Sequence, residues 1–383
     1  MSTATATAPR TIPMVDLKGQ YAHIAEEVDR AVLEVVRSTQ FIKGPYVQRF
    51  ERELGEYLGV KHVIGCANGT DALQIAMMAL GLEPGDEVIV PSFTYVATAE
   101  VIALLGLVPV MVDVDLDTFN LRASDVEAAI TSRTRAVVPV HLFGQSCDMS
   151  ELLVLAKAHD LYVVEDNAQA IGADYTFPDG RQRKTGALGH IGCTSFFPSK
   201  NLGAYGDGGA LFTDDDELAA KLAQVANHGQ SRQYYHDVVG VNSRLDAMQA
   251  AILSVKLRHL DAYSAARRAA AGAYDAAFAK TSQLQTPIRA PYSTHVFHQY
   301  TLRVLDGSRD ALRERLREAN IAHNVYYPVP LYRQGAFAKT VPAEFSLDNT
   351  ETLCEQVLAL PMHTELGADD IAYITECVNG HFA

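Results

Sequence analysis

The chain has 383 residues, of which 48% are hydrophobic and 20% are charged, and its formal net charge is −14 at pH 7. This composition is typical of a globular enzyme of about two domains and excludes a disordered chain. The excess of negative charge argues against nucleic acid or an anionic membrane as a partner, so an anionic ligand needs local hydrogen-bond donors. No apolar run is long enough to span a bilayer.

The five cysteines are an odd number without a short spacing, so the sequence predicts neither a disulfide framework nor a zinc site. The first ten residues contain an alternation of threonine and alanine, and they lack the basic start and apolar core of a secretory signal. We therefore expect a cytoplasmic protein with a disordered tail over residues 1–10 and without a bound metal.

Short apolar runs alternate with helical patterns along the chain. Strands are predicted at residues 62–67, 87–91, 108–114, 136–141, 162–165, 191–197 and 209–213, and helices at residues 70–80 and 214–227. This alternation predicts an α/β fold with a mainly parallel sheet that is covered by helices on both faces. Ligand sites in such sheets lie at the carboxyl ends of the strands.

The sequence changes in character near residue 257, where an amphipathic helix rich in alanine and arginine begins. A strand near residues 300–304, a helix near residues 309–319 and a proline-rich turn at residues 326–331 follow it. We therefore expect a large domain over residues 11–256, with an N-terminal segment, and a smaller C-terminal α+β domain over residues 257–383.

Lys200 lies among the apolar and glycine-rich neighbours of residues 195–203, and a second glycine-rich run follows at residues 205–209. A lysine amine attacks an aldehyde only when it is unprotonated, and partial burial or a nearby cation lowers its pKa toward that state. Lys200 is therefore the first candidate for a Schiff base. The alternative is an ordinary solvated lysine beside a loop.

Two polar segments follow predicted strands and suit other parts of one ligand. Residues 68–71 join a strand to a helix, where Gly69 lets the backbone approach a phosphate and Thr70 adds a hydroxyl to the free amides of the first turn. Asp166 and Gln169 follow another strand, and an aspartate there can hold a proton on a heterocyclic nitrogen. The alternative for both segments is plain capping of a helix or turn.

Two further segments complete the set. The aromatic rings of Phe93 and Tyr95 follow a strand and can cover a planar ligand, although an aromatic residue there can also belong to the core. Asn242 and Arg244 lie in the polar break at residues 240–246, which is otherwise a loop with a solvated arginine. With Lys200, these segments supply what pyridoxal 5'-phosphate requires: an aldehyde trap, a phosphate cup, a carboxylate for the ring nitrogen and a stacking face.

Residues 68–72, 165–169, 195–200 and 242–244 occur in the order and spacing of one known family. From about Ile12 to its C-terminus the chain resembles the DegT/DnrJ/EryC1/StrS family of PLP-dependent sugar-nucleotide aminotransferases. Within that family it is most similar to UDP-2-acetamido-2-deoxy-3-oxo-glucuronate aminotransferases of bacterial O-antigen pathways. The resemblance implies the aspartate-aminotransferase type of fold (fold type I), L-glutamate as the amino donor that leaves as 2-oxoglutarate, and a nucleotide-linked keto sugar as the acceptor.

The resemblance also implies a role for each candidate residue. It implies that Lys200 forms the Schiff base and moves a proton, that Asp166 contacts the ring nitrogen and that Gln169 contacts the ring oxygen. Tyr95, with Phe93 nearby, would cover the ring, and the phosphate would be held by Gly69, Thr70 and Ser195, with Asn242 reaching it from the partner subunit of a homodimer. The sugar nucleotide would be bound by Arg244, Tyr326 and Tyr327. Many relatives have histidine where Tyr326 stands. This departure leaves the role of Tyr326 open.

Three alternatives to this assignment differ in what they require of the sequence. The substrate is alternatively a dTDP- or GDP-linked keto-deoxysugar that is aminated at C3 or C4. A sister branch of the family dehydrates keto sugars and has histidine in place of the Schiff-base lysine, so Lys200 disfavours it. A non-catalytic regulatory or binding protein with the same fold predicts a degraded lysine, aspartate or phosphate cup, and none of these is degraded here.

Overall fold

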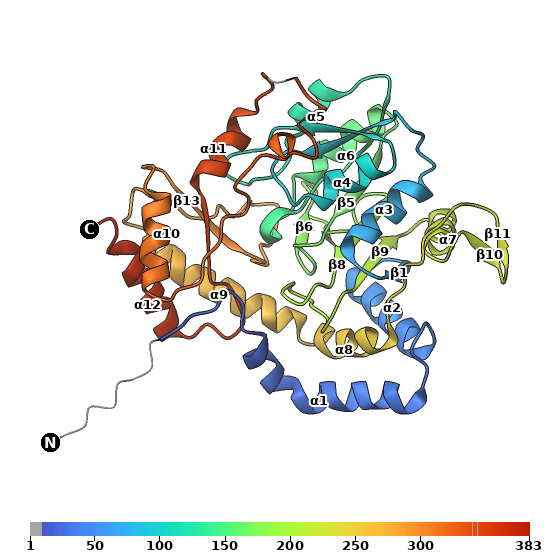
Figure 1. The fold of residues 1–383 in the computed structure, drawn as a ribbon, viewed down its shortest axis with the longest axis horizontal. Coiled ribbons are helices and arrows are strands. Elements are labelled where there is room, and N and C mark those ends of the chain that lie inside the picture. Colours follow the sequence, from blue (N-terminus) through green and yellow to red (C-terminus); the bar gives the residue numbers. More distant parts are fainter. Residues whose placement is uncertain (1–9, 339, 343) are drawn as a thin grey trace.

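The computed structural model describes residues 10–338, 340–342 and 344–383 (Figure 1). Its largest sheet has seven strands in the order β1-β9-β8-β5-β4-β2-β3. These strands are β1 (His62–Cys66), β2 (Glu87–Pro91), β3 (Val108–Val112), β4 (Thr134–Val137), β5 (Tyr162–Asp166), β8 (Ile191–Ser195) and β9 (Gly209–Thr213). Of the predicted tail at residues 1–10, only Arg10 is described, and its guanidinium pairs with Asp370; the rest lies outside the described residues.

The direction of the strands places several chain ends at one edge. β1 and β8 each pair antiparallel with β9, so they run in the same direction. The pairs from β8 through β5, β4 and β2 to β3 are all parallel. The carboxyl ends of β1, β2, β5 and β8 therefore lie at the same edge, as the predicted mainly parallel sheet requires.

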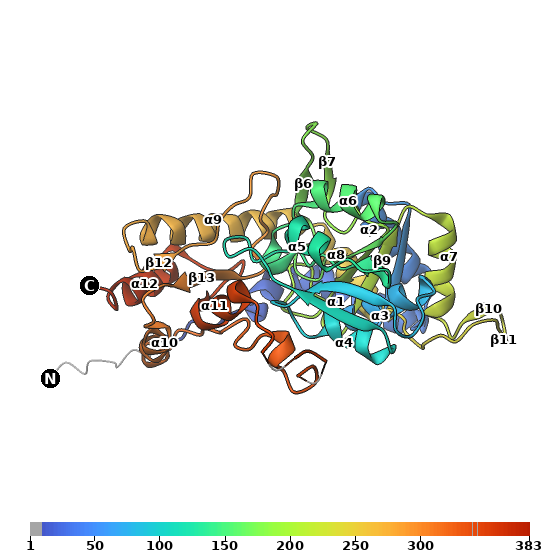
Figure 2. The ribbon, with the colours of Figure 1, turned by 90° about the horizontal axis from the view of Figure 1, so that it is seen from above.

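Helices cover both faces of this sheet. One face carries α3 (Gly69–Ala79), α4 (Ala97–Leu104) and α7 (Asp216–Val225), and the other carries α1 (Leu17–Ser38), α2 (Pro45–Leu58), α5 (Ala123–Ala129), α6 (Met149–Ala158) and α8 (Ala247–Leu257). Along β2, Val88 and Val90 pack in the core beneath α3, α4 and α7, and Ile89 packs in the core beneath α5 and α6, because successive strand residues point to opposite faces. Figure 2 shows α4 and α6 on opposite sides of the sheet.

A three-stranded antiparallel sheet forms the centre of the C-terminal part of the chain (Figure 1). It consists of β12 (Leu284–Gln285), β13 (Tyr300–Val304) and β14 (Val357–Leu360), and its core includes side chains of α9 (Leu260–Phe278), α10 (Arg309–Glu318), α11 (Asp348–Gln356) and α12 (Ala368–Asn379). We propose the expected domain boundary at residue 257, between α8 and α9. Among the described residues, no helix is both long and apolar enough to cross a membrane.

The structure contains elements that the sequence analysis did not predict, among them the long helices α1 and α2, and it changes the bounds of others. The strand predicted at residues 136–141 runs instead from Thr134 to Val137. Pro139 has no amide hydrogen for the ladder, and pairing resumes only as an isolated bridge between Val140 and Asp166. Two hairpins, β6 (Asp174–Thr176) with β7 (Gln182–Lys184) and β10 (Gln230–Arg232) with β11 (Tyr235–His236), were not predicted. Two three-residue helices, η1 (Leu142–Gly144) and η2 (Leu331–Arg333), were not predicted either. Figure 2 shows both hairpins projecting from the body of the molecule.

Candidate active site

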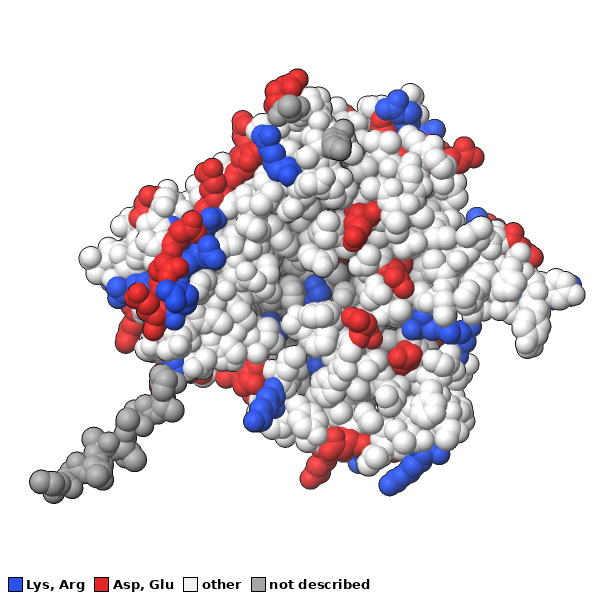
Figure 3. Space-filling model, viewed as in Figure 1, with Lys and Arg blue, Asp and Glu red and all other residues white. Residues whose placement is uncertain are grey.

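The predicted site residues collect at the carboxyl edge of the large sheet. Asp166 is the last residue of β5, Ser195 is the last residue of β8, and α3 begins three residues after β1 ends. Figure 3 shows a hollow near the middle of this face of the molecule, with Lys or Arg atoms inside it. This arrangement follows from the parallel strands, whose ends supply loops to a common crevice.

The start of α3 forms a cup for an anion. Asn68 caps the helix, because its side-chain oxygen accepts the Asp71 N–H at 2.8 Å and its carbonyl oxygen accepts the Ala72 N–H at 3.1 Å. The first N–H groups of a helix have no partner within it, so those of Gly69 and Thr70 remain free to bind a ligand. The Ser195 hydroxyl lies beside them, since a Cβ built on Gly69 would be 3.2 Å from the Ser195 Oγ.

Lys200 lies in the turn that follows β8. Its backbone N–H donates to the Phe197 carbonyl oxygen at 2.8 Å, and its side chain is partly buried. No group in the described part of the chain forms a hydrogen bond or ion pair with its amine. Burial lowers the pKa of Lys200 to about 8, and the negative charge of Asp166 opposes that effect. A substantial fraction of the amine is therefore neutral near physiological pH, as attack on an aldehyde requires.

Two donors from the protein hold the buried carboxylate of Asp166. The Thr98 hydroxyl donates to Oδ2 at 2.8 Å, and the Ala168 N–H donates to Oδ1 at 3.1 Å. The strand itself is fixed by the preceding Glu165, whose carboxylate accepts the backbone N–H groups of Gly186 and Leu188. A carboxylate has about four acceptor positions, so Asp166 keeps positions free for a donor in the crevice.

Gln169 and Tyr327 form a fixed polar pair next to Asp166. The side-chain oxygen of Gln169 accepts the Phe143 N–H at 2.8 Å, and its amide nitrogen donates to the Tyr327 hydroxyl at 3.2 Å. This nitrogen retains one N–H for a ligand. Burial raises the pKa of the Tyr327 phenol, so its hydroxyl keeps its proton and can donate as well.

The aromatic residues of the site differ in exposure. Phe93 is 1% exposed and lies 5.8 Å, between ring centroids, from Tyr327. Tyr95 is 57% exposed, and its ring lies 6.5 Å from that of Tyr327. Tyr326 is half-buried and packs edge-on against Tyr327 at 6.0 Å. Tyr95 is therefore the ring with a free face, and Phe93 supports the cluster from the interior.

Asn242 and Arg244 lie in the segment that precedes α8. The neighbouring Ser243 accepts the Ala67 N–H at 3.0 Å, which holds this segment beside the end of β1. Asn242 is exposed and Arg244 is half-buried. Within the described residues, neither side chain forms a hydrogen bond or ion pair. Both are thus available to a ligand or to another subunit.

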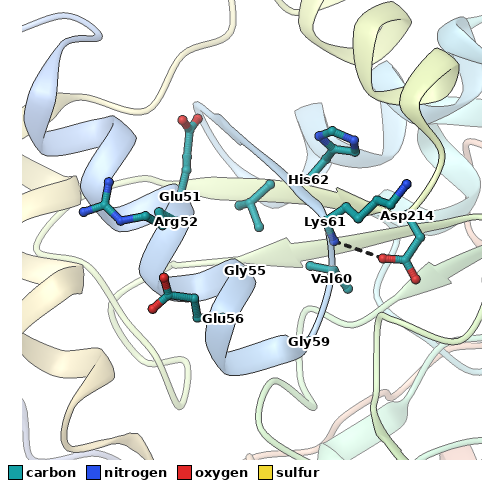
Figure 4. A pocket seen from close by; sticks show the side chains of 10 residues that line it. Glu51, Arg52, Gly55, Glu56, Gly59, Val60, Lys61, His62 and Asp214 are labelled. Carbon is teal, nitrogen blue, oxygen red and sulfur yellow. Dashed lines mark hydrogen bonds between the residues drawn. The ribbon is translucent and has the colours of Figure 1, made fainter.

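A surface pocket of about 550 Å³ lies away from this crevice, between α2, β1 and Asp214 (Figure 4). The Lys61 N–H donates to Asp214 at 3.0 Å, and the His62 ring pairs with Asp216 at 2.7 Å. These polar groups therefore already have partners. No cluster of His, Cys, Asp or Glu side chains arranged to hold a metal ion occurs among the described residues.

The sequence did not predict three groups that border the site. Thr98 contacts Asp166, and the Phe143 N–H orients Gln169. His298 lies near Lys200: burial lowers the pKa of His298, and the charge of Lys200 lowers it further. Each of them comes from an element that is distant in sequence from the residue it approaches. Local sequence patterns contain no signal for such contacts.

Comparison with known proteins assigns the chain to a family. The profile of the DegT/DnrJ/EryC1/StrS aminotransferase family matches residues 22–379. The chain belongs to this family. It is 47% identical to a pleiotropic regulatory protein of Geobacillus stearothermophilus, with 95% of this chain and 97% of that protein covered. It is 46% identical to the UDP-2-acetamido-2-deoxy-3-oxo-D-glucuronate aminotransferase of Pseudomonas aeruginosa, with 95% and 98% covered.

Solved structures agree with this assignment. The crystal structure of S. venezuelae DesV superposes with a TM-score of 0.93 and 41% identity, and the match covers 98% of this chain and 99% of that one. Other relatives are a dTDP-3-amino-3,4,6-trideoxy-α-D-glucose transaminase and a GDP-perosamine synthase. The protein is therefore an aminotransferase, and its fold is the predicted aspartate-aminotransferase type.

The cofactor of this family is pyridoxal phosphate. The structure of NtdA from Bacillus subtilis, which is 29% identical with a TM-score of 0.89, holds the cofactor PMP, its aminated form. The crevice fits this group: Lys200 suits its aldehyde, the buried carboxylate of Asp166 suits its ring nitrogen, and the cup at Gly69 suits its phosphate.

Proposed function

We propose that the protein transfers the amino group of L-glutamate to C3 of UDP-2-acetamido-2-deoxy-3-oxo-D-glucuronate in the synthesis of a bacterial polysaccharide such as O-antigen. The observation that carries this proposal is the crevice itself, where a lysine of lowered pKa, a buried carboxylate and an anion cup converge at one sheet edge. When bound, pyridoxal phosphate supplies an aldehyde for the amino group and a ring that withdraws electrons.

Lys200 is proposed to hold the cofactor aldehyde and then to move a proton between the substrate carbon and the cofactor. Both tasks need an amine that alternates between neutral and charged forms, and a pKa of about 8 allows this near neutral pH. The opposing charge of Asp166 keeps the pKa from falling further. Burial and the carboxylate of Asp166 therefore set the pKa of this base.

Asp166 and Gln169 are proposed to set the electronic state of the ring. The carboxylate of Asp166, held by two donors, would keep a proton on the ring nitrogen of the bound cofactor. The remaining N–H of Gln169 would bind the ring oxygen, and the exposed ring of Tyr95, supported by the buried Phe93, would cover one face of the cofactor. The carboxylate and the amide both come from the end of β5, so one strand positions both contacts.

The cofactor phosphate is assigned to Gly69, Thr70 and Ser195. The two free N–H groups of the first turn of α3 and the nearby Ser195 hydroxyl, 3.2 Å from a Cβ built on Gly69, would together bind the phosphate. The positive end of the α3 dipole adds to the attraction of an anion. In a chain of net charge −14, this local source of donors replaces a general positive field.

We propose a homodimer in which Asn242 completes the phosphate site of the partner subunit. The Asn242 side chain is exposed, and apolar side chains near it are also exposed: Phe41 by 45%, Ile42 by 50% and Met248 by 37%. Ile42 forms a backbone bridge with Asp246, which places this apolar group next to the Asn242 segment. An apolar patch that carries a free amide suits an interface between two copies.

Arg244, Tyr326 and Tyr327 are proposed to bind the sugar nucleotide. A hexuronate has a carboxylate beyond its diphosphate, and the planar guanidinium of Arg244 suits a bidentate contact with it. The 46% identity to the UDP-2-acetamido-2-deoxy-3-oxo-D-glucuronate aminotransferase of Pseudomonas aeruginosa supports the same substrate. All five cysteines are free thiols, which agrees with a reducing compartment, and we place the protein in the cytoplasm.

The names of the relatives suggest two alternative functions, amination of another nucleotide sugar and regulation. A dTDP- or GDP-linked keto-deoxysugar lacks the carboxylate that Arg244 would bind. A non-catalytic regulator is suggested by the name of the Geobacillus stearothermophilus relative. The presence of Lys200, Asp166 and the anion cup favours catalysis over that role.

The test is a screen of UDP-, dTDP- and GDP-linked keto sugars with the purified protein and L-glutamate, followed by mass spectrometry of the products. We expect amination of the UDP-linked 3-keto hexuronic acid and formation of 2-oxoglutarate. The yellow colour of the protein should be bleached by glutamate alone. A colourless protein, or one that glutamate leaves unchanged, would support the regulatory function instead.

A further inference from the structure

Thr98 was not among the predicted site residues, but it forms a hydrogen bond with one of them, Asp166. It lies in the first turn of α4 and is 1% exposed. Its hydroxyl donates to Oδ2 of Asp166 at 2.8 Å, across the 68 residues that separate them in the sequence. In the sheet order β5-β4-β2, the strand before α4 is two positions from the strand that ends at Asp166.

The hydroxyl completes a clamp on the carboxylate. Ala168 donates its backbone N–H to Oδ1 of Asp166 at 3.1 Å, and Thr98 donates to Oδ2, so each oxygen receives one hydrogen bond from the protein. Two donors on different oxygens fix the rotation of the carboxylate plane. The free acceptor positions of the carboxylate then point in a fixed direction, in which they can accept a hydrogen bond from a ring N–H in the crevice.

Without the Thr98 hydroxyl, the Ala168 N–H alone would not fix the orientation of the Asp166 carboxylate. The Ala168 N–H lies two residues from Asp166 on the same chain segment and moves with it, whereas Thr98 belongs to a different element. The backbone N–H of Thr98 also donates to the Tyr95 carbonyl oxygen at 3.4 Å. Thr98 thus links the loop that carries Tyr95 to the carboxylate of Asp166.

We propose that Thr98 is a positioning residue that acts through Asp166, holding its carboxylate in the orientation that receives the ring N–H of the cofactor. The inference rests on the proposed role of Asp166. It goes beyond that role because it assigns a requirement for a hydroxyl on α4. A residue that only filled space at this position would need a similar volume but no donor.

Thr98→Val tests the donor at nearly constant shape, and Thr98→Ser keeps the donor while it removes the methyl group. The holoenzyme is loaded with pyridoxal phosphate that carries ¹⁵N in the ring, and the ring resonance is followed by NMR across pH. Stopped-flow absorbance gives the rate of the half-reaction with glutamate. We expect Thr98→Val to move the resonance toward that of an unprotonated ring and to slow the half-reaction by about tenfold to a hundredfold, the effect of one hydrogen bond to a charged group.

Thr98→Ser should restore the wild-type resonance and bring the rate to within about threefold of the wild type, because it keeps the donor. The matched control is Thr375→Val on α12, since Thr375 is also buried and helical but donates to the Ala372 carbonyl oxygen. It should change neither readout. A wild-type resonance and rate in Thr98→Val would overturn the inference, as would a loss of thermal stability without a shift of the resonance.

Asp166→Asn separates this inference from the proposed function. If Asp166→Asn shifts the resonance and Thr98→Val does not, Asp166 contacts the ring and the inference about Thr98 is wrong. If Asp166→Asn itself leaves the resonance unchanged, the proposed role of Asp166 fails. A shift in both variants, with recovery in Thr98→Ser, supports the complete chain of contacts.

Discussion

Gly69 and Ser195 are in direct contact at the anion cup. A Cβ atom built on Gly69 would lie 2.6 Å from the Cβ of Ser195 and 3.2 Å from its Cα. The neighbour at this contact is the strand end itself and not the flexible tip of a side chain. The first turn of α3 can therefore approach the end of β8 only because residue 69 has no side chain.

We predict that Gly69→Ala weakens cofactor binding by at least about tenfold, because the added methyl group separates α3 from β8 and opens the cup. Equilibrium dialysis of pyridoxal phosphate measures the affinity. The control is Gly272→Ala in α9, where a Cβ meets no atom within 4 Å. That variant should bind the cofactor normally and be more stable by about 0.5–1 kcal/mol, as is usual for alanine in place of a helical glycine. Normal affinity in Gly69→Ala would show that the phosphate lies elsewhere.

A second prediction concerns the pH dependence of cofactor capture. Burial lowers the pKa of Lys200 to about 8, so the amine is mostly protonated below that pH and mostly neutral above it. The rate at which cofactor-free enzyme captures pyridoxal phosphate should rise with pH through about 8 and then level off. Stopped-flow absorbance across pH 6–10, a range chosen to bracket that pKa, measures this rate.

Borohydride reduction and peptide mapping identify the lysine that captures the cofactor. Lys256 is a demanding internal control, because burial lowers its pKa to about 8 as well. We expect the label on Lys200 alone and no label in Lys200→Ala. A label on Lys256 would show that a lowered pKa, and not the position at the crevice, selects the amine.

The strands of the large sheet were predictable because they depend on local patterns, but several of their ends were not: the strand predicted at residues 108–114 ends at Val112, and that predicted at residues 191–197 ends at Ser195. The apolar run that starts at Tyr162 ends where the acidic pair Glu165 and Asp166 begins, and the structure places Asp166 at the last position of β5. The glycine at position 69 and the neighbours of Lys200 similarly predicted the two other parts that we assign to the crevice. Each of these signals is contained within a few consecutive residues.

The contacts between distant elements were not predictable from such patterns. The hydrogen bond between Thr98 and Asp166 depends on the order β5-β4-β2, which no local window encodes. The contact between Gly69 and Ser195 depends on β9 entering between β1 and β8 in the opposite direction. The strand predicted at residues 136–141 was too long because its apolar run continues past Pro139.

A third prediction tests whether the site is shared between subunits. Lys200→Ala and Asn242→Ala should each be inactive, but unfolding and refolding them together should restore activity. In a mixed dimer, one site collects both defects and the other site has neither. Recovery of up to about a quarter of wild-type activity is expected from random pairing of subunits that form closed pairs. If Asn242 serves its own chain, every site keeps one defect and the mixture stays inactive.

A fourth prediction concerns the buried cation of Lys256, which is 1% exposed and has no carboxylate partner among the described residues. Its pKa is lowered from 10.5 to about 8, first by burial and then by Arg267. The unfolded chain therefore binds more protons between these pH values, so this lysine destabilises the fold most below pH 8 and stability rises as the pH approaches 10.5. The Tyr205 ring, 5.2 Å from the amine, offsets part of this cost.

Lys256→Met should consequently be more stable at pH 7 by about 1–3 kcal/mol, and the difference should shrink above pH 10. Urea unfolding at several pH values measures it. The exposed Lys280 provides the control, since Lys280→Met should change stability by less than about 0.5 kcal/mol. A less stable Lys256→Met would indicate that the amine has a partner in the dimer.

The fifth prediction concerns the acceptor and rests on charge. The guanidinium of Arg244 has no ionic partner in the described part of the chain, and a hexuronate offers it a carboxylate that the corresponding neutral sugars lack. The wild-type enzyme should therefore prefer the 3-keto hexuronic acid to the matching 6-hydroxymethyl and 6-deoxy sugars. Arg244→Met should lower kcat/KM for the acid by about tenfold to a hundredfold and leave kcat/KM for the neutral sugars within about threefold.

Glutamate also has two carboxylates that Arg244 could bind. Separate measurement of the glutamate and sugar half-reactions therefore shows which of these two ligands Arg244 binds. Arg313, which pairs with Asp310 on the exposed side of α10, provides a matched control, and Arg313→Met should change neither half-reaction. A defect of Arg244→Met that is confined to the glutamate half-reaction would reassign this arginine to the amino donor. Equal use of the acid and neutral sugars by the wild-type enzyme would reject the hexuronate as the specific substrate.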